Sequence, residues 1–332
     1  MKRVLLAGLA SAGLALAAAL GAARSALRPL DPDGAGQVFE VAAGETLPEI
    51  ARRLEQAGLV RHRLGVEILG RTRDLAGRLQ RGEYQLSPAQ SPQEILEQIA
   101  SGRVVTHEVS FPEGFTAVQF AERLARAGLA DRDAFLAVVR NRGTPGQLGV
   151  EGTSLEGYLF PETYRFARGM APVEIARAMV EQFREVWDGI APLAREHGLS
   201  MRDVVILASL VEKETGAPDE RPLIASVFLN RLRRGMRLET DPAVIYGIAD
   251  FDGNLRRRDL ENAANPFNTY RIPGLPPGPI ANPGADSLRA AVAPAQTEYL
   301  YFVSRNDGSH TFSKTYAEHL VAVNRYQRGG GS

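Results

Sequence analysis

The sequence predicts an α+β protein with an N-terminal transmembrane helix, a small α+β domain and a larger mixed α+β domain. Three observations predict it: an apolar N-terminal run, a strand, turn and helix pattern that occurs twice, and a change in composition near Gln147. At 332 residues, with 44% hydrophobic and 23% charged residues, the chain is long enough for two or three packed domains and is not compositionally disordered.

Residues 1–26 form the predicted anchor. Lys2 and Arg3 precede an uncharged apolar run from Val4 to Ala23. About 20 residues at a rise of 1.5 Å span roughly the 30 Å of a bilayer core. The positive-inside rule keeps the Lys2 end in the cytoplasm and places everything after the run outside it. A cleaved signal peptide is the alternative, although such signals have shorter apolar regions, and it leads to the same compartment.

The overall composition excludes several classes of chemistry. Lys+Arg and Asp+Glu are both 39, so no basic excess exists to neutralise a phosphate backbone, and a nucleic-acid partner is not expected. The chain has no cysteine, which excludes disulfides, thiolate zinc sites and cysteine nucleophiles. Its five histidines are scattered without metal-ligand spacing. We therefore expect neither a catalytic metal nor a cofactor.

A small domain is predicted over residues 38–106, after a linker at 27–37 that is rich in Pro, Gly and Asp. A short strand pattern begins at Phe39, and Thr46 is a good N-cap for a helix that ends at Gly58. Residues 82–86 are typical of a strand. Ser91 opens a further helix that extends to Gly102.

The strand, turn and helix pattern recurs 70 positions later, within a repeat-like connecting segment at 107–146. Eight of sixteen positions are identical, which indicates an internal repeat. The matching residues are Gly114, Thr116, Ala121, Arg123, Leu124, Ala127, Gly128 and Leu129, against Gly44, Thr46, Ala51, Arg53, Leu54, Ala57, Gly58 and Leu59. With Gly44-Glu45-Thr46-Leu47, the small domain resembles the LysM module, a β-α-α-β fold that binds carbohydrate. An ordinary small α+β domain without a ligand is the alternative.

The larger domain is predicted over residues 147–328, followed by a flexible tail at 329–332. Its most informative stretch is Ser200–Gly216, a predicted helix with Glu212 and Glu214 in its last turn. Carboxylates there face the negative end of the helix dipole, which favours a raised pKa. The two side chains point roughly 200° apart, and only Glu214 shares a side with apolar residues. Glu214 is therefore the candidate general acid and base, although an ordinary solvated or ion-paired glutamate is the alternative at a helix end.

Several long motifs resemble, in order, those of the endolytic murein transglycosylases of the MltG or YceG-like family. They are LEGYLFPETY (155–164), ASLVEKET (208–215), VFLNRLRRGMRLETDPAVIYG (227–247), FNTYRIPGLPPGPIANPG (267–284), YLYFV (299–303) and HTF (310–312). The resemblance implies a lyase, single-pass in the cell inner membrane with its body outside the cytoplasm. It implies cleavage of nascent peptidoglycan strands between N-acetylmuramic acid and N-acetylglucosamine, which leaves 1,6-anhydro ends and terminates elongation. It also implies Glu214 as the catalytic residue and peptidoglycan synthases as partners.

The candidate substrate-binding residues lie in these motifs. They are Tyr158, Glu162, Glu212, Asn230, Arg231, Asp241, Asn268 and Tyr270. Alternatives remain for several: Asn268 and Asp241 would only fix loops, and Arg231 would pair with Glu212 or bind carboxylates of the muramyl peptide. The aromatic run at 299–302 is interpreted as a core strand and not as a sugar platform.

Two other function classes stay open. A noncatalytic peptidoglycan-binding scaffold would not need Glu214. A hydrolase would need a second carboxylate, for which Asp241 or Glu162 would serve.

Overall fold

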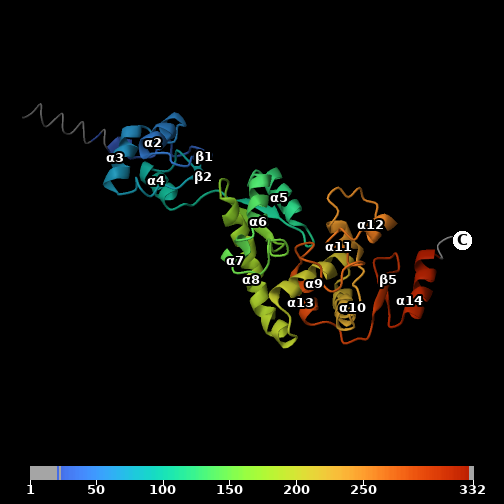
Figure 1. Ribbon diagram of the computed structural model, residues 1–332. Coiled ribbons are helices and arrows are strands. Elements are labelled where there is room, and N and C mark those ends of the chain that lie inside the picture. Colours follow the sequence, from blue (N-terminus) through green and yellow to red (C-terminus); the bar gives the residue numbers. More distant parts are fainter. Residues whose placement is uncertain (1–20, 22–23, 329–332) are drawn as a thin grey trace, which may run out of the picture. The chain divides into compact units, whose positions relative to one another are not determined.

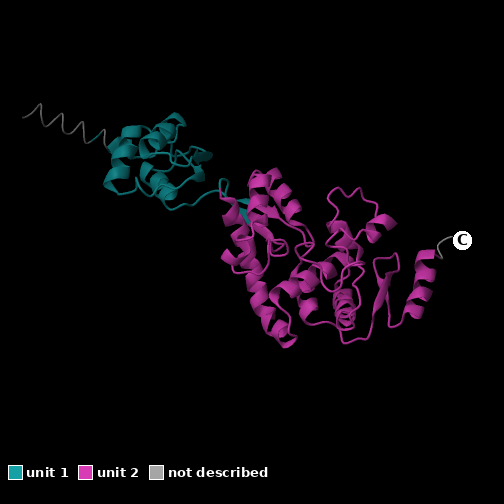
Figure 2. Ribbon diagram, viewed as in Figure 1, with its two compact units in different colours: residues 1–107, 165–169 teal, residues 108–164, 170–332 magenta. Residues whose placement is uncertain are grey.

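The computed structural model describes residue 21 and residues 24–328. The chain forms two compact units (Figure 2). Unit 1 is the chain up to His107 together with Arg165–Gly169, and unit 2 is Glu108–Tyr164 together with the chain from Met170 onward. No helix of the described residues is long and apolar enough to cross a membrane. Most of the predicted anchor, and all of the predicted tail, lie outside the described residues.

The core of the described part of unit 1 is built from a pair of strands and the helices that pack on it (Figure 1). In chain order they are β1 (Gln37–Val41), α2 (Leu47–Gln56), α3 (Arg63–Thr72), β2 (Gly82–Leu86) and α4 (Pro92–Ala100). β1 and β2 are antiparallel, with Phe39 opposite Tyr84. Ile50, Leu54, Leu86 and Ile95 are fully buried between the hairpin and the helices. Alternating apolar residues in the strands and helix-spaced ones in α2 and α4 thus build one small core.

The predicted helix starts of unit 1 are confirmed. The Thr46 backbone N–H donates to Glu49 Oε2 at 2.8 Å at the start of α2. The Ser91 N–H donates to Glu94 Oε2 at 2.7 Å, and Ser91 Oγ accepts from the Glu94 N–H at 3.3 Å. Each capping box satisfies N–H groups that have no partner within the helix.

Unit 2 is larger and mostly helical. Its first part holds α5 (Ala117–Arg126), α6 (Arg132–Arg140) and α7 (Thr144–Gln147), with residues 108–110 of β3 (His107–Ser110) and residues 163–164 of β4 (Thr163–Phe166). β3 and β4 pair with each other. The rest comprises α8 (Pro172–Glu196), α9 (Met201–Glu214), η1 (Pro218–Glu220), α10 (Arg221–Arg233), α11 (Asp241–Tyr246), α12 (Arg257–Glu261), α13 (Ala285–Val292), β5 (Tyr301–Ser304), β6 (His310–Ser313), α14 (Tyr316–Val323) and η2 (Asn324–Arg328).

Helix α9 is the centre of unit 2. Every side chain from Val204 to Val211 is buried, and α8, α10, α11 and α13 pack against the helix. A helix that is apolar on all sides is stable only when surrounded in this way. Ser200 caps it as predicted, accepting from the Asp203 N–H at 3.1 Å. The helix ends at Glu214, two residues before the predicted end at Gly216, because Thr215 is extended (φ −142°, ψ 140°).

The structure confirms the internal repeat. α2 and α5 begin and end 70 residues apart, at Leu47 and Ala117 and at Gln56 and Arg126. The turn glycines before them have φ of 78° and 75°, and those after them 67° and 66°, a conformation that costs glycine nothing. A second helix follows each, α3 or α6, and the flanking strands pair, β1 with β2 and β3 with β4. Both copies are therefore β-α-α-β, the second with an insertion before β4.

The second copy is not a separate connecting segment. Residues 108–146 belong to unit 2, because α6 packs against α8. In addition, the Ala117 N–H at the start of α5 donates to the buried Glu156 carboxylate at 2.9 Å. The boundary of the larger unit thus lies at 108, not at 147.

Candidate active site

Glu214 lines a cavity in unit 2. Its half-buried side chain is carried by the last residue of α9. The cavity has a volume of about 380 Å³. Its lining residues are Glu214, Arg231, Leu238, Glu239, Asp241, Tyr270, Phe302, Val303, His319 and Val323. Segments far apart in sequence, from 214 to 323, therefore converge on one carboxyl group.

The electrostatic setting of Glu214 suits proton transfer. Burial raises the pKa of its carboxyl to about 7, and the nearby charge of Asp241 adds to the rise. The Thr240 hydroxyl opposes it, but no hydrogen bond of good geometry forms, since Thr240 Oγ1 is buried without a partner among the described residues. Near neutral pH the group populates both its acid and its base form, which a residue acting in both roles requires.

A hydrogen-bonded pair, Asp241 and Tyr270, lies beside Glu214 in the same cavity. The Tyr270 hydroxyl donates to Asp241 Oδ1 at 2.7 Å. The segments that carry them are tied together, because the Thr240 N–H donates to Thr269 Oγ1 at 3.0 Å and Thr269 Oγ1 donates to the Thr240 carbonyl at 3.1 Å. Both residues are therefore placed where a substrate at Glu214 would meet them.

Arg231 is buried and forms one wall of the cavity. Its Nε donates to the Leu300 carbonyl at 2.7 Å and its Nη1 to Glu239 Oε2 at 3.0 Å. The expected alternative pairing with Glu212 is wrong, since the partner is Glu239. Glu239 itself has a φ of 54°, a left-handed conformation that costs an ordinary residue about 1 kcal/mol. This pair joins α10 to the segment just before Asp241.

Glu212 does not line the cavity. Its Oε1 lies 3.4 Å from Nη2 of the buried Arg221, and its Oε2 accepts from the Gly284 N–H at 3.1 Å. Arg221 also pairs with Glu113 at 3.2 Å. The predicted divergence of Glu212 and Glu214 is thus observed, and Glu212 joins the end of α9 to α10 and to the turn before α13.

The two asparagines predicted as substrate ligands fix the backbone instead. Asn268 is fully buried, and its amide donates to the carbonyls of Leu260 and Asn262 at 3.0 and 2.8 Å. Asn230 donates to the Thr297 carbonyl at 2.9 Å. Neither lines the cavity, because each amide is occupied by carbonyl groups of a neighbouring loop.

Tyr158 and Glu162 also lie away from the cavity. Tyr158 is buried with its ring edge-on to Phe183, at 5.1 Å between centroids. Glu162 is exposed and accepts from the Thr163 N–H at 3.0 Å. Of the two carboxylates considered as a hydrolase's second group, only Asp241 shares the cavity with Glu214.

Comparison with known proteins places the chain in a family. The sequence profile of the YceG-like family matches residues 39–325. The chain belongs to the YceG-like family. An endolytic murein transglycosylase of Bacillus subtilis (strain 168) is 30% identical over 320 residues, which is 91% of this chain and 88% of that protein. One of Streptococcus pneumoniae (strain D39) is 28% identical over 84% of this chain and 56% of its own length.

The solved structure of a YceG-like protein of Listeria monocytogenes is also similar to this chain. Its TM-score is 0.60 at 29% identity, with 87% of this chain and 100% of that chain covered.

The sequence interpretation missed the other lining residues of this YceG-like site, among them Glu239, Phe302 and His319. Phe302 lies in the strand expected to be core, yet it is only half-buried and faces the cavity. Burial lowers the pKa of His319, and the charge of Arg231 lowers it further. His319 has no local signal, since it reaches the cavity only through the packing of α14 on β5.

A second buried carboxyl, Glu156, was also missed. It accepts from the Tyr246 hydroxyl at 3.1 Å and from the Asn282 amide at 2.9 Å, as well as from the Ala117 N–H. Burial raises its pKa to about 7. It does not line the cavity of Glu214, and its partners make it the joint between the second copy and the rest of unit 2.

Proposed function

We propose that this protein is an endolytic lytic transglycosylase that cleaves peptidoglycan glycan strands with Glu214 as its single acid and base. The family membership and the names of the relatives support the activity. The observation that carries the role of Glu214 is its position at the end of α9, half-buried in a cavity, with a pKa raised by burial to about 7.

The proposed chemistry needs one carboxyl group. Protonated Glu214 donates its proton to the glycosidic oxygen as the bond from that oxygen to C1 of N-acetylmuramic acid breaks, and C1 takes on oxocarbenium character. The resulting carboxylate accepts the proton of the C6 hydroxyl of the same sugar while that oxygen bonds to C1. A 1,6-anhydro ring forms, no water is consumed, and Glu214 is protonated again.

The neighbouring polar groups would hold the reacting sugar. Asp241 and Tyr270 form one hydrogen-bonded unit beside Glu214. The charge of Asp241 favours the protonated form of Glu214 and would stabilise positive charge at C1. Unlike a hydrolase, the enzyme would leave no role for a water molecule activated by Asp241.

The cellular setting is proposed on the sequence. The apolar run at 4–23 would anchor the protein in the inner membrane, with both units outside the cytoplasm. The β-α-α-β order of unit 1 supports a LysM-like role in holding glycan, and peptidoglycan synthases are the expected partners. Cleavage by the protein would terminate the growing glycan strand.

Mass spectrometry of digested peptidoglycan tests the proposal. The full-length protein should release fragments with 1,6-anhydro ends, and Glu214→Gln should release none because the amide cannot donate and retrieve the proton. Glu162→Gln is the control and should keep the anhydro products, since Glu162 is exposed and lies outside the cavity. Reducing ends would indicate a hydrolase, and intact glycan from the wild type would favour a binding scaffold.

A further inference from the structure

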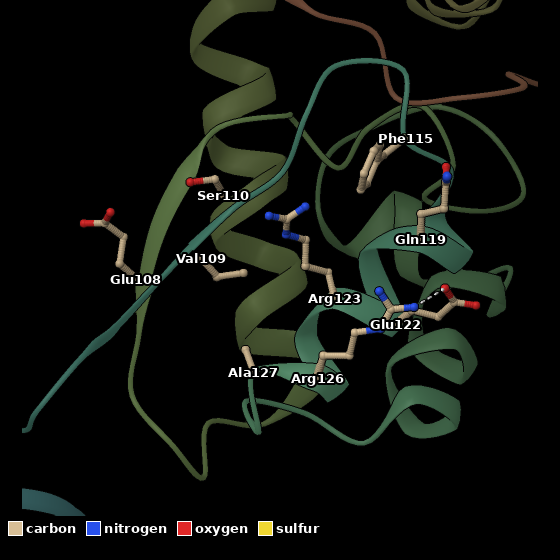
Figure 3. A pocket seen from close by; sticks show the side chains of 9 residues that line it. All are labelled: Glu108, Val109, Ser110, Phe115, Gln119, Glu122, Arg123, Arg126 and Ala127. Atoms are coloured by element: carbon tan, nitrogen blue, oxygen red, sulfur yellow. Dashed lines mark ion pairs between the residues drawn. The ribbon is translucent and has the colours of Figure 1, made fainter.

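A second cavity in unit 2 takes no part in the proposed mechanism. It lies between β3 and α5 and has a volume of about 720 Å³, against 380 Å³ at Glu214. We call it the α5 groove. Val109, Phe115 and Ala127 give it apolar walls (Figure 3). The polar lining residues are Glu108, Ser110, Gln119, Glu122, Arg123 and Arg126. Its volume is in the range of sites for small organic ligands.

The internal repeat shows what is special about this groove. Arg53 of the first copy and Arg123 of the second occupy equivalent positions. Arg53 Nη1 lies 2.8 Å from both carboxylate oxygens of Glu45. The residue equivalent to Glu45 in the second copy is Phe115, and the Arg123 guanidinium lies 5.9 Å from the centroid of its ring. The substitution removes the neutralising carboxylate and replaces it with an aromatic face that orients the cation.

Arg123 consequently has an unmatched charge. Among the described residues, no carboxylate lies within ion-pair distance (4 Å) of its guanidinium group. Arg126 pairs with Glu122 only at 3.6 Å, and its side chain is 82% exposed. An exposed pair of this kind contributes little and can be exchanged for a ligand's carboxylate. Two adjacent guanidinium groups on one helix face suit a carboxylate.

The shape of the groove suits an extended peptide. β3 pairs only with β4, in a two-stranded sheet, so no strand of the described chain occupies its other edge. The face of β3 that carries Val109 is turned toward α5, whereas Glu108 points away from the helix (Figure 3). A free strand edge beside side-chain pockets is a common way to hold an extended peptide.

The groove is joined to the helix that carries Glu214. The Lys213 Nζ donates to the Gly114 carbonyl at 3.4 Å, one residue before Phe115. The Asn282 N–H donates to the Phe115 carbonyl at 2.9 Å. A ligand in the groove would thus lie against a loop that contacts the end of α9.

We propose that the α5 groove binds the peptide stem of the peptidoglycan strand, with a carboxylate of the stem on Arg123 and Arg126. This assignment rests on the proposed substrate. A stem is an extended peptide with a free carboxylate, and it is covalently joined to the sugar that would react at Glu214. The groove would therefore select strands that carry stems and would contribute to binding, not to the chemical step.

Kinetics on two substrates tests the assignment. The full-length protein is assayed on glycan strands with intact stems and on the same strands stripped by an amidase. Arg123→Gln should raise KM about tenfold on the stem-bearing strands, the loss of one charged hydrogen bond. It should leave kcat unchanged and have no effect on stripped strands. Phe115→Glu should raise KM on the stem-bearing strands in the same way, because a glutamate at 115 would pair with Arg123 as Glu45 pairs with Arg53. Arg195→Gln is the control, because Arg195 is an exposed residue of α8 and does not line the groove.

A second measurement separates this idea from the proposed function. The free stem peptide released by the amidase is titrated calorimetrically into full-length Glu214→Gln and into Glu214→Gln with Arg123→Gln. Binding only to the first supports the groove even if the wild type cleaves no glycan. Equal binding to both, absence of binding to both, equal KM changes on both strand types, or no change on either would overturn the assignment.

Discussion

The two β-α-α-β copies share one frame but differ in what surrounds it. The first forms unit 1 with its own core, and α4 completes it. The second is part of unit 2, where Glu156 accepts hydrogen bonds from its helix α5 and from Tyr246 and Asn282. At equivalent positions Arg53 is neutralised by Glu45, whereas Arg123 lies over Phe115. The comparison teaches that the repeat fixes the backbone, and that single side chains decide whether a copy is self-contained or open to a ligand.

The largest expected effect comes from breaking the joint between the second copy and unit 2. Glu156→Ala leaves three donors, two of them buried, without their acceptor, so the free energy of unfolding of unit 2 should fall by about 3–5 kcal/mol. Hydrogen exchange followed by mass spectrometry should show faster exchange throughout unit 2 and unchanged exchange in unit 1. Equal acceleration in both units would show that the two copies do not unfold separately.

A smaller effect is expected from removing the matched helix caps. Thr46→Ala and Thr116→Ala each delete an N-cap hydroxyl and should each cost about 1 kcal/mol. Exchange should increase in α2 for the first and in α5 for the second. Only Thr116→Ala should reduce glycan cleavage, because α5 is tied to Glu156. A similar loss of activity from Thr46→Ala would contradict the division of roles.

The smallest expected effects on stability come from the two equivalent arginines, and Arg53→Gln should cost more than Arg123→Gln. Arg53→Gln removes an ion pair to both oxygens of Glu45, so it should lower stability by up to about 1 kcal/mol. Arg123→Gln should stay within about 0.5 kcal/mol of the wild type, since the side chain is exposed and has no such partner. Urea unfolding measures both. A larger cost for Arg123→Gln would mean that Arg123 serves the fold and not a ligand.

Local signals in the sequence predicted the features that depend on neighbouring residues. The helix starts at Thr46 and Ser91 and the end of α9 near Glu214 depend on residues within a few positions. The repeat was visible as identical residues 70 positions apart. The family resemblance added the catalytic role of Glu214, which remains a prediction.

Other parts of the site could not be read from the sequence. Glu156 joins the second copy to the rest of unit 2 because its partners lie at 117, 246 and 282. For Asn268 the sequence left a sugar ligand and a loop-fixing residue open, and the bonds of its amide to carbonyls at 259–262 show the second. His319 and Phe302 face the cavity only after β5 and α14 have packed together. Tertiary packing decided the roles of Glu156, His319 and Phe302, and the partners of Glu156 lie 39, 90 and 126 positions away in the sequence.

The pH dependence of kcat/KM tests the central claim about Glu214 most directly. The first step needs the protonated carboxyl, whose pKa burial raises to about 7. The rate should therefore be constant at lower pH and fall as the pH rises through about 7. Asp241→Asn removes a negative charge that raises this pKa, so the fall should move to lower pH. A fall centred near 4.5, the ordinary value for a glutamate, or a midpoint that Asp241→Asn leaves in place, would contradict Glu214 as the buried general acid.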